Sequence, residues 1–237
     1  MSTVPSNCQV IQTFKSLSIA IKQWVRDQNN QEDYFSYTIN PDAQIDLQKL
    51  GRNFNKIDHP CLVKYVSQTN NQLFFKYPSK FTQLTKTTEL DDTAKMCLIY
   101  GVASALNTLH LFNIIHGNLS FASVYVNQKG KPKLFDYGIY SQPTQHLRFK
   151  SFEVLNGEPP TNKSDVYSFG IFMYKLIMGK NPFANNTNLT QQQPQLEKDK
   201  KMSDKLFSII NLCLQAEPSS RPTINELLKM MLDQDII

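Results

Sequence analysis

Apolar residues alternate with polar ones, or run together, in three short stretches near the start of the chain. These stretches cover residues 9–14, 17–25 and 34–39, and the polar run at residues 28–31 separates the second from the third. A period of two is typical of β-strands, and polar runs are typical of turns. The pattern therefore predicts three strands.

Helical spacing replaces this alternation after residue 40. Pro41 and Asp42 offer a helix start, and apolar residues then recur at roughly helical intervals as far as Ile57. Two further strands are expected after that helix, joined by a turn at Asn70 and Asn71.

A longer helix is predicted from Asp91, because its apolar residues recur at intervals of three and four. It leads into residues 114–138, where two short apolar strands flank the polar turn at residues 127–131. This stretch carries two motifs, His116-Gly117-Asn118-Leu119 and Asp136-Tyr137-Gly138. Polar side chains at the ends of two adjacent strands make it the first place to look for chemistry.

Further motifs follow in a fixed order. Residues 151–155 read Ser-Phe-Glu-Val-Leu, residues 163–170 read Lys-Ser-Asp-Val-Tyr-Ser-Phe-Gly, and residues 218–222 read Pro-Ser-Ser-Arg-Pro before a last amphipathic helix. In sequence and spacing, these motifs and the two in residues 114–138 resemble protein kinases, whose catalytic loop reads His-Arg-Asp and whose metal-binding motif reads Asp-Phe-Gly.

The resemblance implies an α+β, two-lobed protein kinase-like fold. A single domain is expected over residues 1–237, with a small, mostly β lobe holding one helix up to about residue 78 and a larger, mostly helical lobe from about residue 79. His59-Pro60 resembles the dipeptide that follows the small-lobe helix in kinases. The N-terminal half is also loosely similar to Scy-like pseudokinases.

The groups that hold ATP in kinases are expected to be missing. The first glycine is Gly51, so a glycine-rich loop is absent from the region of the first strands. The phosphate-binding lysine of the third strand falls near Thr38, and no lysine stands between Lys22 and Lys49. An alternative takes Lys22 itself as that lysine, which leaves little chain for two preceding strands.

The helix and the hinge also depart from the family pattern. The glutamate that pairs with the lysine falls near Leu50, or at Gln48 or Asp46 in another register. Phe75 falls where it would narrow the adenine pocket, and Pro78 falls where a backbone N–H would be needed.

Three positions decide the expected chemistry. Asn118 stands where the resemblance places the aspartate that accepts the substrate proton, and its amide is too weakly basic for that role. Ser123 stands in place of a metal-ligating asparagine, so both positions are read as degenerate and no catalytic residue is expected. Asp136 is the one remaining candidate for ATP or a metal, a weak one because a lone carboxylate holds magnesium poorly. Neither a cofactor nor a metal is therefore expected.

The resemblance assigns structural roles to a second group of residues. They would hold the catalytic loop, stack the aromatic residue of the Asp-Tyr-Gly motif, or tie the segment after it to the last helices: His116, Tyr137, Gly138, Glu153, Asp165 and Arg221.

Composition adds little to this picture. The net charge of +5 and the 41% hydrophobic share fit an ordinary globular protein, and no basic patch indicates nucleic-acid binding. The four cysteines lack metal-ligand spacing. No signal peptide and no membrane-spanning stretch is recognised, so a cytoplasmic location is expected, alone or with a cytoskeletal or other large assembly.

From these residues we expect a catalytically inactive kinase-like domain, not an enzyme, that acts as a scaffold or architectural subunit and binds other proteins. Two alternatives stay open. One is a nucleotide-binding sensor without turnover, and the other is a divergent active Ser/Thr kinase that recruits Lys22 and tolerates Asn118. Fold alone does not decide among them.

Overall fold

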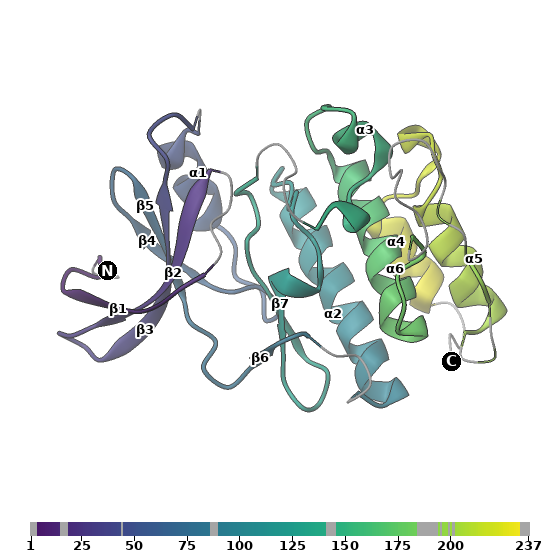
Figure 1. Cartoon of the computed structure of the whole chain (residues 1–237), viewed down its shortest axis with the longest axis horizontal. Helices are drawn as coiled ribbons and strands as arrows, with labels where there is room; N and C mark the ends of the chain where they lie inside the picture. Colours follow the sequence, from purple (N-terminus) through teal and green to yellow (C-terminus); the bar gives the residue numbers. More distant parts are fainter. Residues whose placement is uncertain are drawn as a thin grey trace.

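The structure is a computed structural model that describes residues 4–14, 19–43, 45–85, 90–140, 146–183, 194, 196–198, 200 and 202–232. A smaller, mostly β lobe and a larger, mostly helical lobe lie next to each other along the long axis of the molecule (Figure 1). The expected α+β, two-lobed architecture is confirmed. The division of residues 1–237 near residue 78 stays a prediction.

The small lobe is an antiparallel sheet with one helix. Its strands lie in the order β1-β2-β3-β5-β4, and helix α1 contacts β4. The bounds are β1 Cys8–Thr13, β2 Ala20–Asp27, β3 Glu32–Ile39, α1 Leu47–Phe54, β4 Tyr65–Gln68 and β5 Gln72–Lys76. The helix begins later than Pro41, because Asp46 is its N-cap and accepts a 2.9 Å hydrogen bond from the Lys49 backbone N–H.

The large lobe holds a second, three-stranded sheet and five helices within the described residues. The sheet strands are β6 Thr82–Gln83, β7 Val124–Val126 and β8 Pro132–Leu134. The helices are α2 Asp92–Leu111, α3 Phe152–Leu155, α4 Asn162–Met178, α5 Asp204–Cys213 and α6 Ile224–Leu232, with short 3-10 turns η1 Phe121–Ser123, η2 Leu147–Phe149 and η3 Pro218–Ser220.

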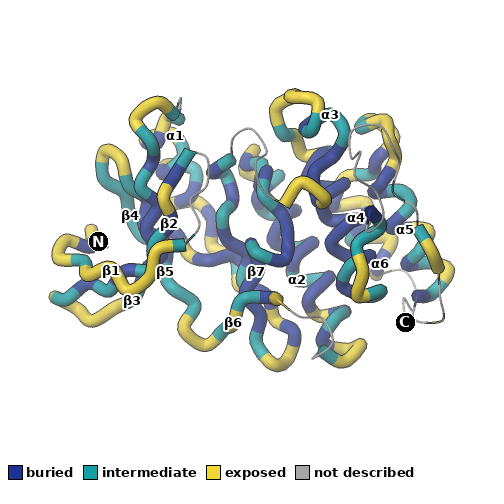
Figure 2. Tube along the Cα trace, viewed as in Figure 1, coloured by how far each residue is buried: buried dark blue, intermediate teal, exposed yellow. Residues whose placement is uncertain are grey.

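Helix α4 forms the centre of the large lobe. It is buried along most of its length, with helices α2 and α5 packed against it (Figure 2). Thr161 and Ser164 form a capping box at its start, and Gly179 ends it in the left-handed conformation with a φ of 70°. Among the described helices, none has the length and apolar character needed to cross a bilayer.

Candidate active site between the lobes

Asp136 lies between the two lobes, shortly after β8. Its backbone has a φ of 63°, a left-handed conformation that non-glycine residues rarely adopt and that clusters at functional sites. Its Oδ1 accepts a 2.5 Å hydrogen bond from the Tyr37 hydroxyl and lies 3.3 Å from the Lys22 ammonium. Both partners come from the small lobe, so this one carboxylate joins the lobes.

The strand register brings these two partners together. Lys22 on β2 pairs directly with Tyr37 on β3, and residues opposite each other in an antiparallel pair share one face of the sheet. Tyr37, and not Thr38, is therefore the β3 residue that reaches Asp136. Thr38 faces the other way and accepts a 3.0 Å hydrogen bond from Gln72.

Lys22 is buried among aromatic rings. Its Nζ lies 3.4 Å from the centre of the Phe135 ring and 4.3 Å from that of Phe35, in cation–π contact with both. Burial lowers the pKa of Lys22 to about 8, although the Asp136 carboxylate acts in the opposite direction. The structure thus brings Lys22 to Asp136, as the alternative requires, but from the second strand and not from the third.

Helix α1 contributes packing to the site. A Cβ added to Gly138 would meet Phe54 at 3.1 Å and Leu50 at 3.3 Å, so these apolar side chains lie against the Asp-Tyr-Gly motif. Asp46 caps the helix and Gln48 is exposed. Among the ion pairs of the described residues, the carboxylate that contacts Lys22 is that of Asp136, and helix α1 supplies none.

Aromatic rings fill the space between β3 and the β7–β8 hairpin. The Phe35 ring lies 4.9 Å from Tyr77, 5.7 Å from Tyr125 and 5.4 Å from Phe135, measured between ring centres. This space adjoins Lys22 and Asp136, where the resemblance places a nucleotide. A nucleotide that enters here has to displace the Phe35 side chain.

The hinge positions lie close by. Phe75 packs edge-on against Phe54 and Tyr137, with ring centres 5.5 Å apart in both pairs. Pro78 follows β5, and its carbonyl accepts a 2.9 Å hydrogen bond from the Phe81 backbone N–H. As in the sequence-based expectation, Pro78 has no N–H to offer an adenine.

Both polar atoms of the Asn118 side chain form hydrogen bonds within the protein. Its Nδ2 donates a 2.7 Å hydrogen bond to the Ile139 carbonyl, and its Oδ1 accepts a 3.0 Å hydrogen bond from the Lys150 ammonium. The same ammonium donates to the Gly117 carbonyl at 2.5 Å. The amide therefore ties the catalytic loop to the segment before α3. Lys150 was missed by sequence reasoning, since it lies far along the chain and belongs to no motif spacing.

Ser123 closes a turn of its own loop. Its hydroxyl donates to the Ser120 carbonyl at 2.9 Å and accepts from the Ser120 backbone N–H at 3.0 Å. The described residues contain no group of three or more His, Cys, Asp or Glu side chains that could hold a metal ion. A metal at this site would depend on Asp136 and on ligands that arrive with the nucleotide.

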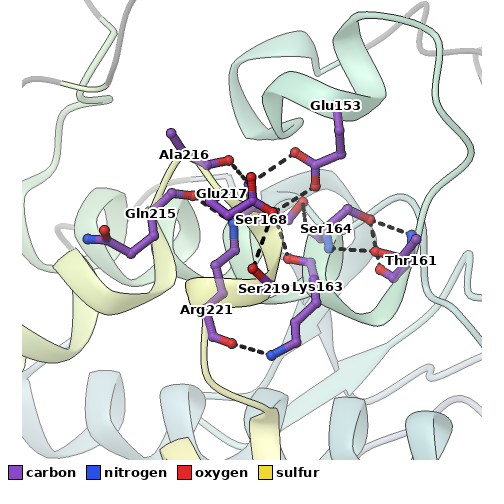
Figure 3. Close-up of polar contacts among 10 residues, drawn as sticks. All are labelled: Glu153, Thr161, Lys163, Ser164, Ser168, Gln215, Ala216, Glu217, Ser219 and Arg221. Atoms are coloured by element: carbon purple, nitrogen blue, oxygen red, sulfur yellow. Dashed lines mark hydrogen bonds and ion pairs between the residues drawn. The ribbon is translucent and has the colours of Figure 1, made fainter.

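The Glu153–Arg221 pair lies in the large lobe, between α3 and the turn η3 (Figure 3). Arg221 donates two hydrogen bonds to the Glu153 carboxylate, at 2.6 and 3.0 Å, and three to backbone carbonyls of Lys163, Gln215 and Ala216. All the N–H groups of its guanidinium are thus satisfied. Such a bidentate, fully bonded pair fixes the segment before α4 to the chain before α6.

Asp165 on α4 is hydrogen-bonded to the backbone of the loop that carries His116 and Gly117. Its carboxylate accepts 2.8 Å hydrogen bonds from the backbone N–H groups of His116 and Gly117, and Oδ2 lies 2.9 Å from His110 Nε2. Burial favours a higher pKa for Asp165, but these partners outweigh it and lower the pKa. We call Glu153, Asp165 and Arg221 the frame.

Tyr137 and His116 are both buried. Tyr137 packs edge-on against Phe54 at 5.2 Å and donates a 2.6 Å hydrogen bond to the Val63 carbonyl. His116 Nδ1 accepts a 3.1 Å hydrogen bond from the Asn118 backbone N–H, and burial lowers the pKa of His116 to about 4. A neutral imidazole therefore lies under the catalytic loop.

Comparison with known proteins gives a consistent result. The protein kinase domain family model matches residues 8–232. The chain is 32% identical over 54% of its length to probable serine/threonine-protein kinase mkcD of Dictyostelium discoideum, and 31% identical over 61% to serine/threonine-protein kinase CTR1 of Arabidopsis thaliana. A third relative, probable serine/threonine-protein kinase mkcC of D. discoideum, is 26% identical over 78% of the chain. The matches span 22%, 20% and 23% of these relatives' own lengths.

These findings contradict the expectation that the chain is not an enzyme. The match to the kinase domain and the kinases among its relatives point to one. The expectation rested on several missing groups, and a lysine for the phosphates was one of them. Lys22, on the neighbouring strand, places its ammonium 3.3 Å from Asp136, so the site does contain a lysine.

Proposed function

This chain belongs to the protein kinase domain family, and on that premise we propose that it transfers the γ-phosphoryl group of ATP to serine or threonine hydroxyls of protein substrates. The relatives named above are serine/threonine-protein kinases, which supports that acceptor class. The observation that carries the proposal is the contact between the Lys22 ammonium and the Asp136 carboxylate, 3.3 Å apart between the lobes.

Lys22 supplies the positive charge that phosphoryl transfer needs. Kinases use one lysine to hold phosphate oxygens and one aspartate to hold the magnesium ion that bridges them. Lys22 and Asp136 bring these two functional groups together from opposite lobes. Because the surroundings of Lys22 exclude water, its charge acts on a bound phosphate more strongly than it would in solvent.

Magnesium fits this site as an ion that arrives with ATP. Proteins commonly bind Mg²⁺ through one or two carboxylates together with substrate phosphates and water. Asp136 is such a carboxylate, and its side chain is 11% exposed. The bound ion would neutralise phosphate charge, while Tyr37 and Lys22 fix the orientation of the carboxylate.

We propose a slow enzyme. Asn118 cannot take the substrate proton, and loss of a general base typically costs about 10²–10⁴-fold in rate. Phe35 also has to leave the space between β3 and β7–β8 before a nucleotide fits, and the energy of that rearrangement weakens ATP binding. The proposed enzyme therefore needs high ATP concentrations and long assays.

The test is transfer of radiolabel from γ-labelled Mg-ATP to a library of serine- and threonine-centred peptides. Wild type should label peptides, whereas Lys22→Met and Asp136→Ala should lower labelling to background. Lys64→Met, which removes an exposed lysine of the small lobe, is the matched control and should match wild type. Folding of each variant is checked by thermal melting. No labelling by folded wild type, or equal labelling by Asp136→Ala, would overturn the proposal.

Protein partners follow from this function, since protein substrates must bind. We propose no nucleic-acid partner. A cytoplasmic location and the looser similarity of the N-terminal half to Scy-like proteins stay predictions.

A further inference from the structure

Lys150 is a buried amine in contact with Asn118, the position at which the family resemblance places the residue that accepts the substrate proton. The residue stands between η2 and α3, and it is 6% exposed. Its Nζ donates to the Gly117 carbonyl at 2.5 Å and to Asn118 Oδ1 at 3.0 Å. The position that carries an aspartate in the family is thus filled by an asparagine that holds a lysine.

Within the described residues, the Lys150 amine forms no ion pair with an acidic side chain. The titratable groups that face it are Asp165 on α4 and His116 in the catalytic loop. Asp165 already accepts hydrogen bonds from the backbone of His116 and Gly117 and contacts His110. Lys150 therefore interacts electrostatically with the Asp165 carboxylate without contacting it, and its hydrogen bonds within the described part of the chain go to two neutral acceptors, the Gly117 carbonyl and Asn118 Oδ1.

An amine in such surroundings can lose its proton near neutral pH. Burial lowers the pKa of Lys150 to about 8, with Asp165 acting in the opposite direction. About a tenth of the molecules then carry a neutral amine at pH 7. General bases work best when their pKa lies near the working pH and the proton is within hydrogen-bond reach.

Building on the proposed function, we propose that Lys150 is the general base of this site and takes the role that Asn118 cannot fill. The neutral amine accepts the proton of the substrate hydroxyl. The alcohol oxygen then forms a bond to the γ-phosphorus while the bond from that phosphorus to the bridging oxygen of ADP breaks. The resulting ammonium of Lys150 returns its proton to solvent.

Asn118 is a positioning residue in this scheme. Its Oδ1 holds the Lys150 amine, and its Nδ2 is anchored on the Ile139 carbonyl. An aspartate at the same place would hold Lys150 as a charged ammonium, because an ion pair in a buried site favours the charged form. The asparagine keeps the amine free to titrate.

The test is the pH dependence of kcat/KM for peptide phosphorylation between pH 6 and 9.5. Wild type should rise about tenfold per pH unit and level off above about pH 8. Lys150→Met and Lys150→Arg should both lose about 10²-fold or more, since neither side chain can accept a proton. An arginine variant that keeps wild-type activity would assign Lys150 a purely electrostatic role and overturn the inference.

Rescue separates a base from a structural contact. In the double variant Asn118→Asp with Lys150→Met, a carboxylate replaces the amine as base, so activity should return and be level from pH 6 upward. Lys64→Met again serves as control.

A direct measurement does not depend on turnover. The ¹³Cε resonance of Lys150, assigned through its loss in Lys150→Arg, should titrate with a midpoint near 8. A midpoint near the usual value above 10 overturns the inference. Absence of transfer by wild type defeats the proposed function and this inference together, whereas transfer that persists in Lys150→Met defeats the inference alone.

Discussion

Two of the ion pairs among the described residues, Glu153–Arg221 and Lys22–Asp136, are built in opposite ways. In the frame, Arg221 makes two hydrogen bonds to Glu153 and satisfies its other N–H groups with backbone carbonyls. Between the lobes, Lys22 approaches Asp136 at 3.3 Å and is otherwise surrounded by aromatic rings. In the first pair, every N–H of the Arg221 guanidinium donates a hydrogen bond. In the second pair, the Lys22 ammonium contacts the Asp136 carboxylate and aromatic rings.

The pKa directions agree with this contrast. Burial favours a higher pKa for Glu153, but the hydrogen bonds from Arg221 outweigh it and lower the pKa. For Lys22, burial outweighs Asp136 and lowers the pKa to about 8. The surroundings therefore favour the charged form of Glu153 and disfavour that of Lys22. A charge kept where the protein disfavours it is typical of a functional site, while the frame pair serves stability.

The largest expected effect is on the frame. Arg221→Met should lower the free energy of unfolding by about 3–5 kcal/mol, because it leaves the half-buried Glu153 and three carbonyls without their partner. Chemical denaturation followed by circular dichroism measures the loss. Arg52→Met, which removes an exposed arginine of α1, is the control and should stay within about 0.5 kcal/mol of wild type. A loss below about 1 kcal/mol for Arg221→Met would remove the contrast between the two pairs.

The frame was predictable from the sequence, and the reason is physical. Glu153, Asp165 and Arg221 lie in or beside helices whose patterns are strong, so their motifs appear at characteristic spacings. The strands were also predictable within a few residues, because one buried face imposes alternation. The sequence predicts too early a start for α1, because Asp42 and Asp46 both precede the helix and only the hydrogen bond from the Lys49 N–H identifies Asp46 as the cap.

The site was far less predictable. Lys22 reaches Asp136 because of the strand register opposite Tyr37, which local sequence does not encode. Lys150 meets Asn118 from 32 positions further along the chain. Motif spacing identifies only the positions at which the family residues are missing. The side chains that stand in for them, Lys22 and Lys150, come from other parts of the chain and are brought to the site by the tertiary structure.

The next effect concerns His116, which lies between the frame and the site. Its pKa is about 4 in the folded protein and near 6.5 unfolded, so the unfolded chain binds more protons between these values. Stability should therefore fall as pH drops from about 6.5 to 4, by on the order of 3 kcal/mol from this residue. Urea unfolding across that range should show a shallower decline for His116→Gln than for wild type.

The control for this measurement is His59→Gln. His59 is only partly buried, and its pKa is lowered as well, by burial first and by Lys133 second. The variant should change the pH slope less than His116→Gln does. Parallel pH profiles for wild type and His116→Gln would show that the imidazole is not held neutral in the fold.

A smaller effect, in the opposite direction, is expected from the site pair. Lys22→Met should leave stability unchanged or raise it by up to about 2 kcal/mol, because burying the Lys22 ammonium costs more free energy than its contact with Asp136 returns, as the lowered pKa of Lys22 indicates. Asp136 keeps its hydrogen bond from Tyr37. Denaturation midpoints compared with Lys64→Met measure the difference. A loss above about 2 kcal/mol would mean that Lys22 stabilises the fold as Arg221 does.

The smallest effect tests whether the frame depends on its helix as well as on its ion pair. Thr161 caps α4 through a hydrogen bond from the Ser164 backbone N–H, and Asp165 lies in the same turn. Thr161→Ala should cost about 1 kcal/mol, the usual value of a lost N-cap, and Thr161→Ser should cost less because it keeps the hydroxyl. Amide hydrogen exchange should report the loss in the first turn of α4 and leave β2 and β3 unchanged. Equal loss of protection in β2 and β3 would show that the frame and the small-lobe strands unfold together as one cooperative unit. Frame and site would then differ in the chemistry of their ion pairs and not in local stability.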